Sequence, residues 1–355
     1  MTIESVSAAA STDARTLRLE VAEVVPETSD AVTLVFARSD EGHPSFDYRP
    51  GQFVTLEIPH GDGESLARCY SLSSSPDVDD LPAISVKRTT GGYASNWLCD
   101  NITVGSTLVA LRPAGTFVPP RWDKPLVLAA AGSGITPVMS ILKTALAVHD
   151  QHVVLIYANR GSDSVMFAET LDSLLHRYPT RLTVIHWFES DRGLPTDEGL
   201  RDLIDPEPDA DAYLCGPPAF MDLARTALIA AGLSPDAIHR EVFTSIQTNP
   251  FRTGTESRPG TPSQVGTPVT AEVEGEQYSF SCPPETVLLD AMLEQGIDAP
   301  FVCREGTCGA CAFTLKSGEV DMRVNETLDD YEVNKGIRLA CQSVPTSDTV
   351  DIVID

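Results

Sequence analysis

Four cysteines near the C-terminus impose the strongest constraint on how this chain can fold. Cys303, Cys308 and Cys311 lie close together and Cys341 follows later, which gives the spacing C-x4-C-x2-C-x29-C. The first two spacings are those of a plant-type [2Fe–2S] site, in which one tight loop supplies most of the thiolates. The distant cysteine would complete the set of ligands. We therefore predict a cluster that carries single electrons.

Two glycines in this loop, Gly306 and Gly309, fit the same prediction, because the backbone N–H groups must approach the sulfurs closely. A zinc site is an alternative, but it is usually built from two short C-x2–4-C pairs, and here Cys341 stands alone. A disulfide is a second alternative, and it would require an oxidising compartment. The spacing and the glycines together favour iron–sulfur.

The 355 residues are enough for two to three domains. Residues 1–15 are small and polar, so we expect a disordered lead-in and no secretory signal. No apolar run is long enough to cross a membrane. The other four cysteines are scattered without a disulfide-like framework, which favours a reducing, cytoplasmic location. They are Cys69, Cys99, Cys215 and Cys282.

The charge balance argues against some partners. With 25 basic and 51 acidic residues the net charge is −26, so nucleic acid and anionic membrane surfaces are poor partners. Residues 269–355 contain 17 acidic and five basic residues, a net charge of −12. This segment either serves solubility or steers onto a basic patch of a protein partner.

The predicted secondary structure changes once within the first two-thirds of the chain. Residues 16–121 contain short alternating strands separated by turns, for which an antiparallel β-barrel is the natural closure. The expected strands include Leu17–Val25, Ala31–Ala37, Phe53–Ile58 and Ile84–Arg88. Residues 122–243 alternate strands with amphipathic helices, which predicts a parallel, doubly wound α/β sheet. The expected elements are strands Leu126–Ala131, Val153–Tyr157, Leu182–Trp187 and Ala212–Cys215, with helices after Ile135, over Val165–Tyr178 and over Pro218–Ala231.

Residues 244–268 are rich in Thr, Ser, Pro, Gly and Gln, so we expect a flexible linker. Residues 269–355 would form the cluster-binding domain. Its first part, Thr270–Cys282, predicts a hairpin. Thr286–Gln295 predicts a helix that ends at Gly296.

Two motifs in the β-rich part suit a flat, phosphorylated cofactor. In Arg68-Cys69-Tyr70-Ser71, the arginine could hold a pyrophosphate, and the tyrosine on the same side of the strand could lie against a ring. An ordinary strand with a half-buried tyrosine would look the same. Further on, Ser95 could cap a helix whose N–H groups face a phosphate.

Three motifs in the α/β part fall where a dinucleotide would bind. Gly132–Pro137 occupies a strand-to-helix turn, although it lacks the full glycine fingerprint. Cys215-Gly216-Pro217 follows the fourth strand, and a cysteine there could equally be packing. Glu241-Val242-Phe243 ends this part, and its aromatic ring could cover a cofactor or close a core.

Each motif alone is ambiguous, but their order resembles that of the ferredoxin-NADP reductase family. With the C-terminal cysteine loop, the layout is similar to the fused reductases that serve bacterial oxygenases. Within these it is most similar to the reductases of 3-ketosteroid 9α-hydroxylases, on the stretches 68–76, 86–101 and 130–140. The resemblance covers residues 17–355. It implies a plant-type ferredoxin domain of α+β, β-grasp fold at the C-terminus.

The resemblance also implies roles around FAD. Arg68 would bind the pyrophosphate, Tyr70 would stack on the isoalloxazine, and Ser71 would hydrogen-bond near N5. Phe243 would shield the flavin where plant enzymes have a tyrosine. Other positions beside the flavin or its phosphates would be Val86, Lys87, Gly92, Tyr93, Ala94 and Ser95.

For the nicotinamide nucleotide, the resemblance implies that Cys215 packs by the nicotinamide and that Glu241 serves the proton and hydride geometry. The surrounding positions would be Gly132, Ser133, Gly134, Thr136, Pro137, Asn159, Arg160, Gly216 and Pro217. The loop after Tyr157 mixes Arg160, a partner for a 2′-phosphate, with the acid Asp163. The choice between NADH and NADPH therefore stays open. The resemblance favours NADH.

These cofactors make chemical sense together, because a nicotinamide gives two electrons as hydride, a [2Fe–2S] cluster takes one, and a flavin can do both. The resemblance implies a reductase that passes electrons from NAD(P)H through FAD and the cluster to a separate oxygenase. That oxygenase would be a Rieske-type steroid hydroxylase. One alternative is a reductase for a different electron acceptor, phenylacetyl-CoA epoxidase. An alternative of another class is a flavoprotein with a structural zinc module.

Overall fold

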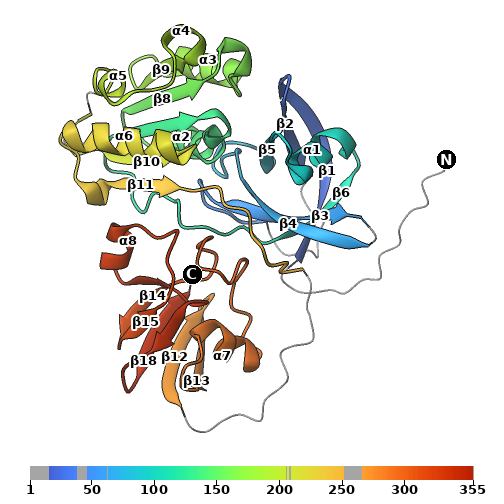
Figure 1. The fold of residues 1–355 in the computed structure, drawn as a ribbon, viewed down its shortest axis with the longest axis vertical. Helices are drawn as coiled ribbons and strands as arrows, with labels where there is room; N and C mark the ends of the chain where they lie inside the picture. Colours follow the sequence, from blue (N-terminus) through green and yellow to red (C-terminus); the bar gives the residue numbers. More distant parts are fainter. Residues whose placement is uncertain are drawn as a thin grey trace, which may run out of the picture.

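The computed structural model describes residues 16–37, 46–61, 63–204, 206–207, 209–251 and 266–354. The predicted lead-in, residues 1–15, and residues 252–265 of the predicted linker lie outside the described residues. Three main sheets of six, five and five strands organise the chain into three lobes (Figure 1). Among the described residues, no helix is both long and apolar enough to cross a membrane.

The N-terminal sheet is antiparallel and closes into the predicted barrel. Its strands are β1 (Thr16–Thr28), β2 (Ala31–Phe36), β3 (Phe53–His60), β4 (Glu64–Ser71), β5 (Ala83–Lys87) and β6 (Thr107–Leu111). They follow the order β4-β3-β6-β1-β2-β5. An antiparallel bridge between Leu72 and Ile84 joins the two outer strands. Helix α1 (Tyr93–Asn101) leads from β5 towards β6.

The second sheet is parallel throughout, as predicted, with the order β11-β10-β7-β8-β9. Its strands are β7 (Leu126–Ala131), β8 (Val153–Asn159), β9 (Leu182–Phe188), β10 (Asp211–Cys215) and β11 (Ile238–Glu241). Its helices are α2 (Ile135–Val148), α3 (Ala168–Arg177), α4 (Glu189–Arg192), α5 (Asp197–Arg201) and α6 (Pro218–Ala230). Because parallel strands end at one edge, the loops after β7, β8 and β10 meet there.

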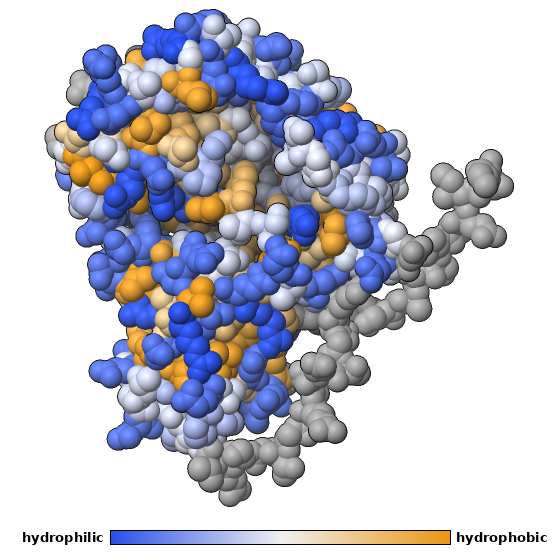
Figure 2. Space-filling view, in the orientation of Figure 1, coloured by the Kyte–Doolittle hydropathy of each residue, from blue (hydrophilic) through white to orange (hydrophobic). Residues whose placement is uncertain are grey.

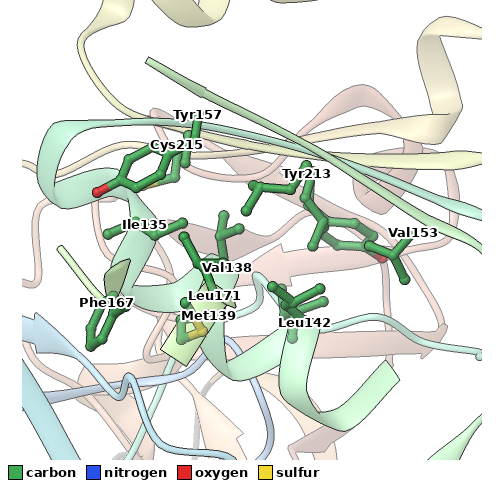
Figure 3. Packing of buried hydrophobic residues seen from close by; sticks show 14 of the residues in the cluster. Ile135, Val138, Met139, Leu142, Val153, Tyr157, Phe167, Leu171, Tyr213 and Cys215 are labelled. Carbon is green, nitrogen blue, oxygen red and sulfur yellow. The ribbon is translucent and has the colours of Figure 1, made fainter. Parts of the chain in front are cut away.

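Helix α2 packs its apolar face on this sheet. Ile135, Val138 and Leu142 are fully buried and lie under Tyr157, Tyr213 and Cys215 (Figure 3). Burying a side chain of this size stabilises a fold by about 1.5–3 kcal/mol. The packing therefore fixes the N-terminus of α2 beside the ends of β7 and β10.

The start of α3 differs from the prediction. The helix was expected from Val165, but it begins at Ala168. Phe167 has φ +59° in the left-handed region, which a helix cannot contain, and its N–H donates to Glu27 Oε2 of the barrel at 2.8 Å. Contact with the first domain thus delays the helix by three residues.

The C-terminal domain has the expected β-grasp layout, a mixed sheet crossed by a helix. Strands β12 (Thr267–Val273), β13 (Glu276–Cys282), β14 (Ala312–Ser317), β16 (Ile337–Leu339) and β18 (Val350–Ile354) follow the order β13-β12-β18-β14-β16. A small sheet pairs β15 (Val320–Met322) with β17 (Ser343–Pro345). Helix α7 (Leu288–Glu294) precedes Gly296, whose φ of +74° ends it as predicted, and α8 (Asp330–Asn334) lies near β11 (Figure 1).

A stability prediction follows from the C-terminal end of α2. The half-buried guanidinium of Arg181 donates to the carbonyls of Ala145 and Leu146, each at 3.0 Å, and Nε donates to Gln151 O at 3.2 Å. Replacing it in Arg181→Met leaves these acceptors unpaired, so we expect the free energy of unfolding to fall by about 1–3 kcal/mol. Calorimetry against Arg177→Met, an exposed arginine next to the same Tyr178 ring, measures it. Equal loss in both variants would contradict the account.

Candidate electron-transfer site

Strand β4 presents the three residues predicted to hold a flavin. Arg68 is half-buried, and its Nη1 donates to Ala67 O at 2.7 Å and to Ile246 O at 3.3 Å. Tyr70 lies partly buried against the barrel core, and burial raises the pKa of its hydroxyl. Ser71 is buried at the end of the strand. An arginine, an aromatic ring and a hydroxyl in this order suit a flavin and its pyrophosphate.

The start of α1 corrects one prediction. Gly92, not Ser95, is the N-cap, and Ser95 lies inside the helix, where its Oγ accepts from Thr89 N at 3.0 Å. No side chain caps the first turn of α1, so its backbone N–H groups suit a phosphate. Tyr93 is exposed and donates to Pro59 O at 2.9 Å. Of the other positions predicted beside the flavin, Ala94 lies buried in α1 and Val86 lies buried in β5.

The glycine turn after β7 touches the end of β10. Residues 132–134 form one 3₁₀ turn that leads into α2, which contains the buried Thr136 and Pro137. A Cβ on Gly134 would lie 2.1 Å from Cys215 O, so only glycine allows this approach. Thr136 Oγ1 donates to Ser133 O at 3.1 Å and tightens the turn. The turn therefore leaves room for a backbone-bound phosphate at the α2 N-terminus.

The end of β8 provides the next part of the same edge. Asn159 is 4% exposed, and neither its Nδ2 nor its Oδ1 has a hydrogen-bond partner among the described residues. Buried amide groups are normally paired, so this side chain fits a polar ligand at the nucleotide edge. The unpaired Asn159 amide therefore fits a dinucleotide bound at this edge of the sheet.

Asp30, in the turn between β1 and β2, was not singled out from the sequence. Its carboxylate lies 2.7 Å from Arg160 Nη2 and 3.7 Å from Lys87 Nζ. Lys87 also donates to Ser164 O at 3.3 Å, and burial lowers its pKa. One carboxylate of the barrel thus pairs with two predicted cofactor residues, one of them in the α/β domain.

Cys215 and Glu241 are direct neighbours in the sheet. They are paired residues of the parallel strands β10 and β11, and Gly216 with φ +154° turns the chain away towards Pro217 and α6. Burial raises the pKa of the Cys215 thiol well above 9, and burial also raises the pKa of the Glu241 carboxyl from 4.5 to about 8. A neutral thiol therefore lies beside a carboxyl that can take up or release a proton near neutral pH. Phe243, two residues on, is 50% exposed.

The four predicted cluster cysteines converge. The thiol of Cys303 contacts those of Cys308 and Cys341, and Cys311 contacts Cys341. These contacts lower the pKa of Cys303, with Cys308 the largest cause. In the described part of the chain, no group of three or more His, Cys, Asp or Glu side chains is arranged to hold a single metal ion. These contacts link all four cysteines, in the order Cys308, Cys303, Cys341 and Cys311, which suits a cluster of two irons held by four thiolates.

Backbone geometry in the cysteine loop fits an anionic core. Gly306 has φ +81° and Gly309 φ +72°, and a Cβ on Gly306 would lie 2.8 Å from Val324 O. Glu305 N donates to Cys303 Sγ at 3.3 Å, and Gln342 Nε2 lies 3.7 Å from Cys341 Sγ. Such N–H donors tune the thiolates of iron–sulfur sites.

The cysteine loop lies against the strand that carries Arg68, Tyr70 and Ser71. A buried apolar cluster joins the barrel, the segment after β11 and the loop; its members are Ala67, Leu111, Ile246, Val302, Cys303 and Ala310, with Cys69 and Cys308 at its margin. The structure thus brings the predicted cluster ligands next to the predicted flavin strand. Sequence reasoning missed Ile246, although an isoleucine in a polar segment is itself a signal of burial.

Known domain families and proteins match nearly the whole of this chain. An FAD-binding oxidoreductase domain profile matches residues 17–118, an oxidoreductase NAD-binding domain profile matches residues 128–226, and a 2Fe-2S iron-sulfur cluster binding domain profile matches residues 271–346. The "3-ketosteroid-9-alpha-monooxygenase, ferredoxin reductase component" of Mycolicibacterium smegmatis is 48% identical over 342 residues, 96% of this chain and 97% of that protein. This chain belongs to the family of monooxygenase ferredoxin reductase components.

More distant proteins share the layout. One component of the 1,2-phenylacetyl-CoA epoxidase of Escherichia coli strain K12 is 35% identical, over 95% of this chain and 96% of its own. The solved structure of phthalate dioxygenase reductase has the same fold, with a TM-score of 0.56 at 24% identity, and covers 96% of this chain and 98% of its own. This reductase component therefore has FAD-binding, NAD-binding and [2Fe–2S] domains, and the iron–sulfur prediction prevails over zinc.

The raised pKa of Glu241 generates a pH prediction. The folded protein holds a proton at Glu241 up to about pH 8, whereas the unfolded chain releases it near pH 4.5. The stability of the wild type therefore declines as pH rises from 4.5 to 8. Glu241→Gln cannot ionise, so we expect it to match the wild type near pH 5 and to exceed it by about 1–3 kcal/mol above pH 8.

Thermal unfolding of the holoprotein across this pH range measures the difference. Glu294→Gln, an exposed residue of α7, is the matched control and should follow the wild type throughout. Parallel pH profiles for Glu241→Gln and the wild type would show that this carboxyl has an ordinary pKa.

Proposed function

We propose that this reductase supplies electrons from NADH, through FAD and its [2Fe–2S] cluster, to a Rieske-type 3-ketosteroid 9α-hydroxylase. The observation that carries the steroid partner is the identity of 48% over nearly the full length of the mycobacterial relative. A Rhodococcus rhodochrous protein of the same name is 47% identical over 95% of this chain. The oxygenase would select the substrate, because this chain contributes only electrons.

When bound, FAD takes the two electrons of a hydride and gives them up singly, and the cluster carries one at a time. Each NADH that becomes NAD⁺ thus releases one proton and reduces two one-electron acceptors. In this proposal Arg68 holds the flavin pyrophosphate, Tyr70 and Phe243 enclose the ring, and the Ser71 hydroxyl faces N5. Their placement on β4 and after β11 supports these roles.

The nucleotide would lie along the carboxyl edge of the parallel sheet. Its pyrophosphate would meet residues 132–137, and Asn159 would pair with the adenosine half. Cys215 would pack against the nicotinamide. Glu241, beside Cys215, would hold or release the proton that accompanies hydride transfer.

We propose that the oxygenase docks on the acidic C-terminal domain. The net charge of −12 on this domain would steer the domain onto a basic patch of the oxygenase. The face shown in Figure 2 carries hydrophilic residues and apolar patches side by side on this lower lobe, which is the mixture that a protein interface uses. The four cysteines outside the cluster set, Cys69, Cys99, Cys215 and Cys282, form no disulfide, which supports a cytoplasmic location, where thiols stay reduced.

Removal of one cluster ligand separates the two halves of the reaction. In Cys308→Ser, we expect NADH-driven reduction of ferricyanide to persist, since ferricyanide takes electrons from the flavin. Reduction of a purified 3-ketosteroid 9α-hydroxylase oxygenase should fall to background, because the cluster is its electron donor. Full support of the oxygenase by Cys308→Ser would contradict the proposed route. If the wild type reduces a phenylacetyl-CoA epoxidase and not the steroid hydroxylase, the epoxidase is the acceptor.

The pair between Asp30 and Arg160 supports the proposed preference for NADH. An arginine after the second strand of such a sheet can bind the 2′-phosphate of NADPH, but here Asp30 holds it at 2.7 Å. We expect Asp30→Asn to free Arg160 and to lower the ratio of kcat/KM for NADH over NADPH by about tenfold. Asp172→Asn, which changes an exposed acid of α3 outside that loop, is the control. An unchanged ratio in Asp30→Asn would show that this pair does not set the preference.

A further inference from the structure

The segment after β11, residues 244–251, was expected to be part of a flexible linker, yet it is anchored along β4. Arg68 Nη1 donates to Ile246 O at 3.3 Å. Three residues earlier on β4, Ser65 O accepts from Asn249 Nδ2 at 2.8 Å, and Ser65 Oγ lies 3.0 Å from the same nitrogen. In Figure 1 this stretch runs from β11 beneath β4, between the barrel and the C-terminal domain.

The same segment holds the cysteine loop. Thr248 Oγ1 donates to the carbonyl of Cys303 at 2.7 Å. Ile246, only 4% exposed, packs in the apolar cluster with Val302, Cys303 and Ala310. One short stretch thus contacts the proposed flavin strand through the Ile246 carbonyl and the Asn249 side-chain amide. It contacts a cluster ligand through the Thr248 hydroxyl.

We propose that residues 244–251 position the cysteine loop against β4 and so set the rate of electron transfer from flavin to cluster, with Thr248 as the main positioning residue. This inference rests on the proposed flavin site along β4. Electron transfer falls steeply with distance, and a small displacement of reacting groups costs orders of magnitude in rate. Contacts that hold the loop therefore have a direct kinetic consequence.

Thr248 is well suited to this role because its contact is specific. The hydroxyl donates to the main chain of a ligand, Cys303. Two other polar contacts between the C-terminal domain and the rest of the chain involve residues outside the cysteine loop. These are the pair of His239 and Asp329 at 2.8 Å and the pair of Arg112 and Glu274 at 3.3 Å. They hold the domain, while Thr248 fixes the loop.

The test uses the full-length holoprotein mixed with NADH without oxygen in a stopped-flow and freeze-quench experiment. Thr248→Val keeps the shape and removes the donor. We expect flavin bleaching by hydride to keep its rate and cluster reduction, read by electron paramagnetic resonance, to slow by about tenfold. Thr248→Ser keeps the hydroxyl and should restore the rate. Thr270→Val, the same change at an exposed position of β12, should behave as the wild type.

The inference is overturned if cluster reduction in Thr248→Val is as fast as in Thr270→Val, or if Thr248→Ser is as slow as Thr248→Val. It is also overturned if flavin bleaching and cluster reduction slow together, since that would show a general loss of structure. Failure of the underlying flavin site is seen separately. If Arg68→Ala keeps FAD as tightly as the wild type, the flavin does not bind along β4.

Discussion

The apolar contact between the cysteine loop and the barrel places the C-terminal domain against the strand proposed to hold the flavin. Ala67 and Leu111 of the barrel, Ile246 of the segment after β11, and Val302 and Ala310 of the loop share one buried cluster. Without this contact the cluster in the C-terminal domain would not receive electrons from the flavin efficiently. Because Arg68 and Tyr70 flank Cys69 on the same strand, this contact brings the proposed flavin site next to the proposed cluster site.

The α/β domain contributes the ends of strands β7, β10 and β11, where its proposed site residues lie. The turn at Gly134 lies against Cys215, and Cys215 pairs with Glu241 on the next strand, so the residues proposed for the nucleotide and for hydride transfer meet at the end of the sheet. Residue 241 then leads within a few positions to Ile246 and Thr248. Only a few residues therefore separate Glu241 from a segment that contacts the cluster loop, although Cys303 itself lies 55 positions after Thr248 in the sequence.

Much of this could be predicted from the sequence, because local patterns determined it. The spacing of Cys303, Cys308 and Cys311 and the apolar runs before Gly132 and Gly216 each rest on a few neighbouring residues. What was missed depends on distant partners. Phe167 delays α3 because Glu27 of the barrel binds its N–H, and Asp30 engages Arg160 across 130 positions. Thr248 contacts a backbone carbonyl, which composition does not reveal, so a polar segment was taken wholly for a linker.

The central claim is that electrons reach the cluster only through the flavin. Protein stripped of FAD, with its cluster intact, tests this most directly when it is mixed with NADH without oxygen and followed by electron paramagnetic resonance. We expect no reduced [2Fe–2S] signal until FAD is restored, and full cluster reduction afterwards. A cluster that NADH reduces equally well in the FAD-free protein would contradict the account.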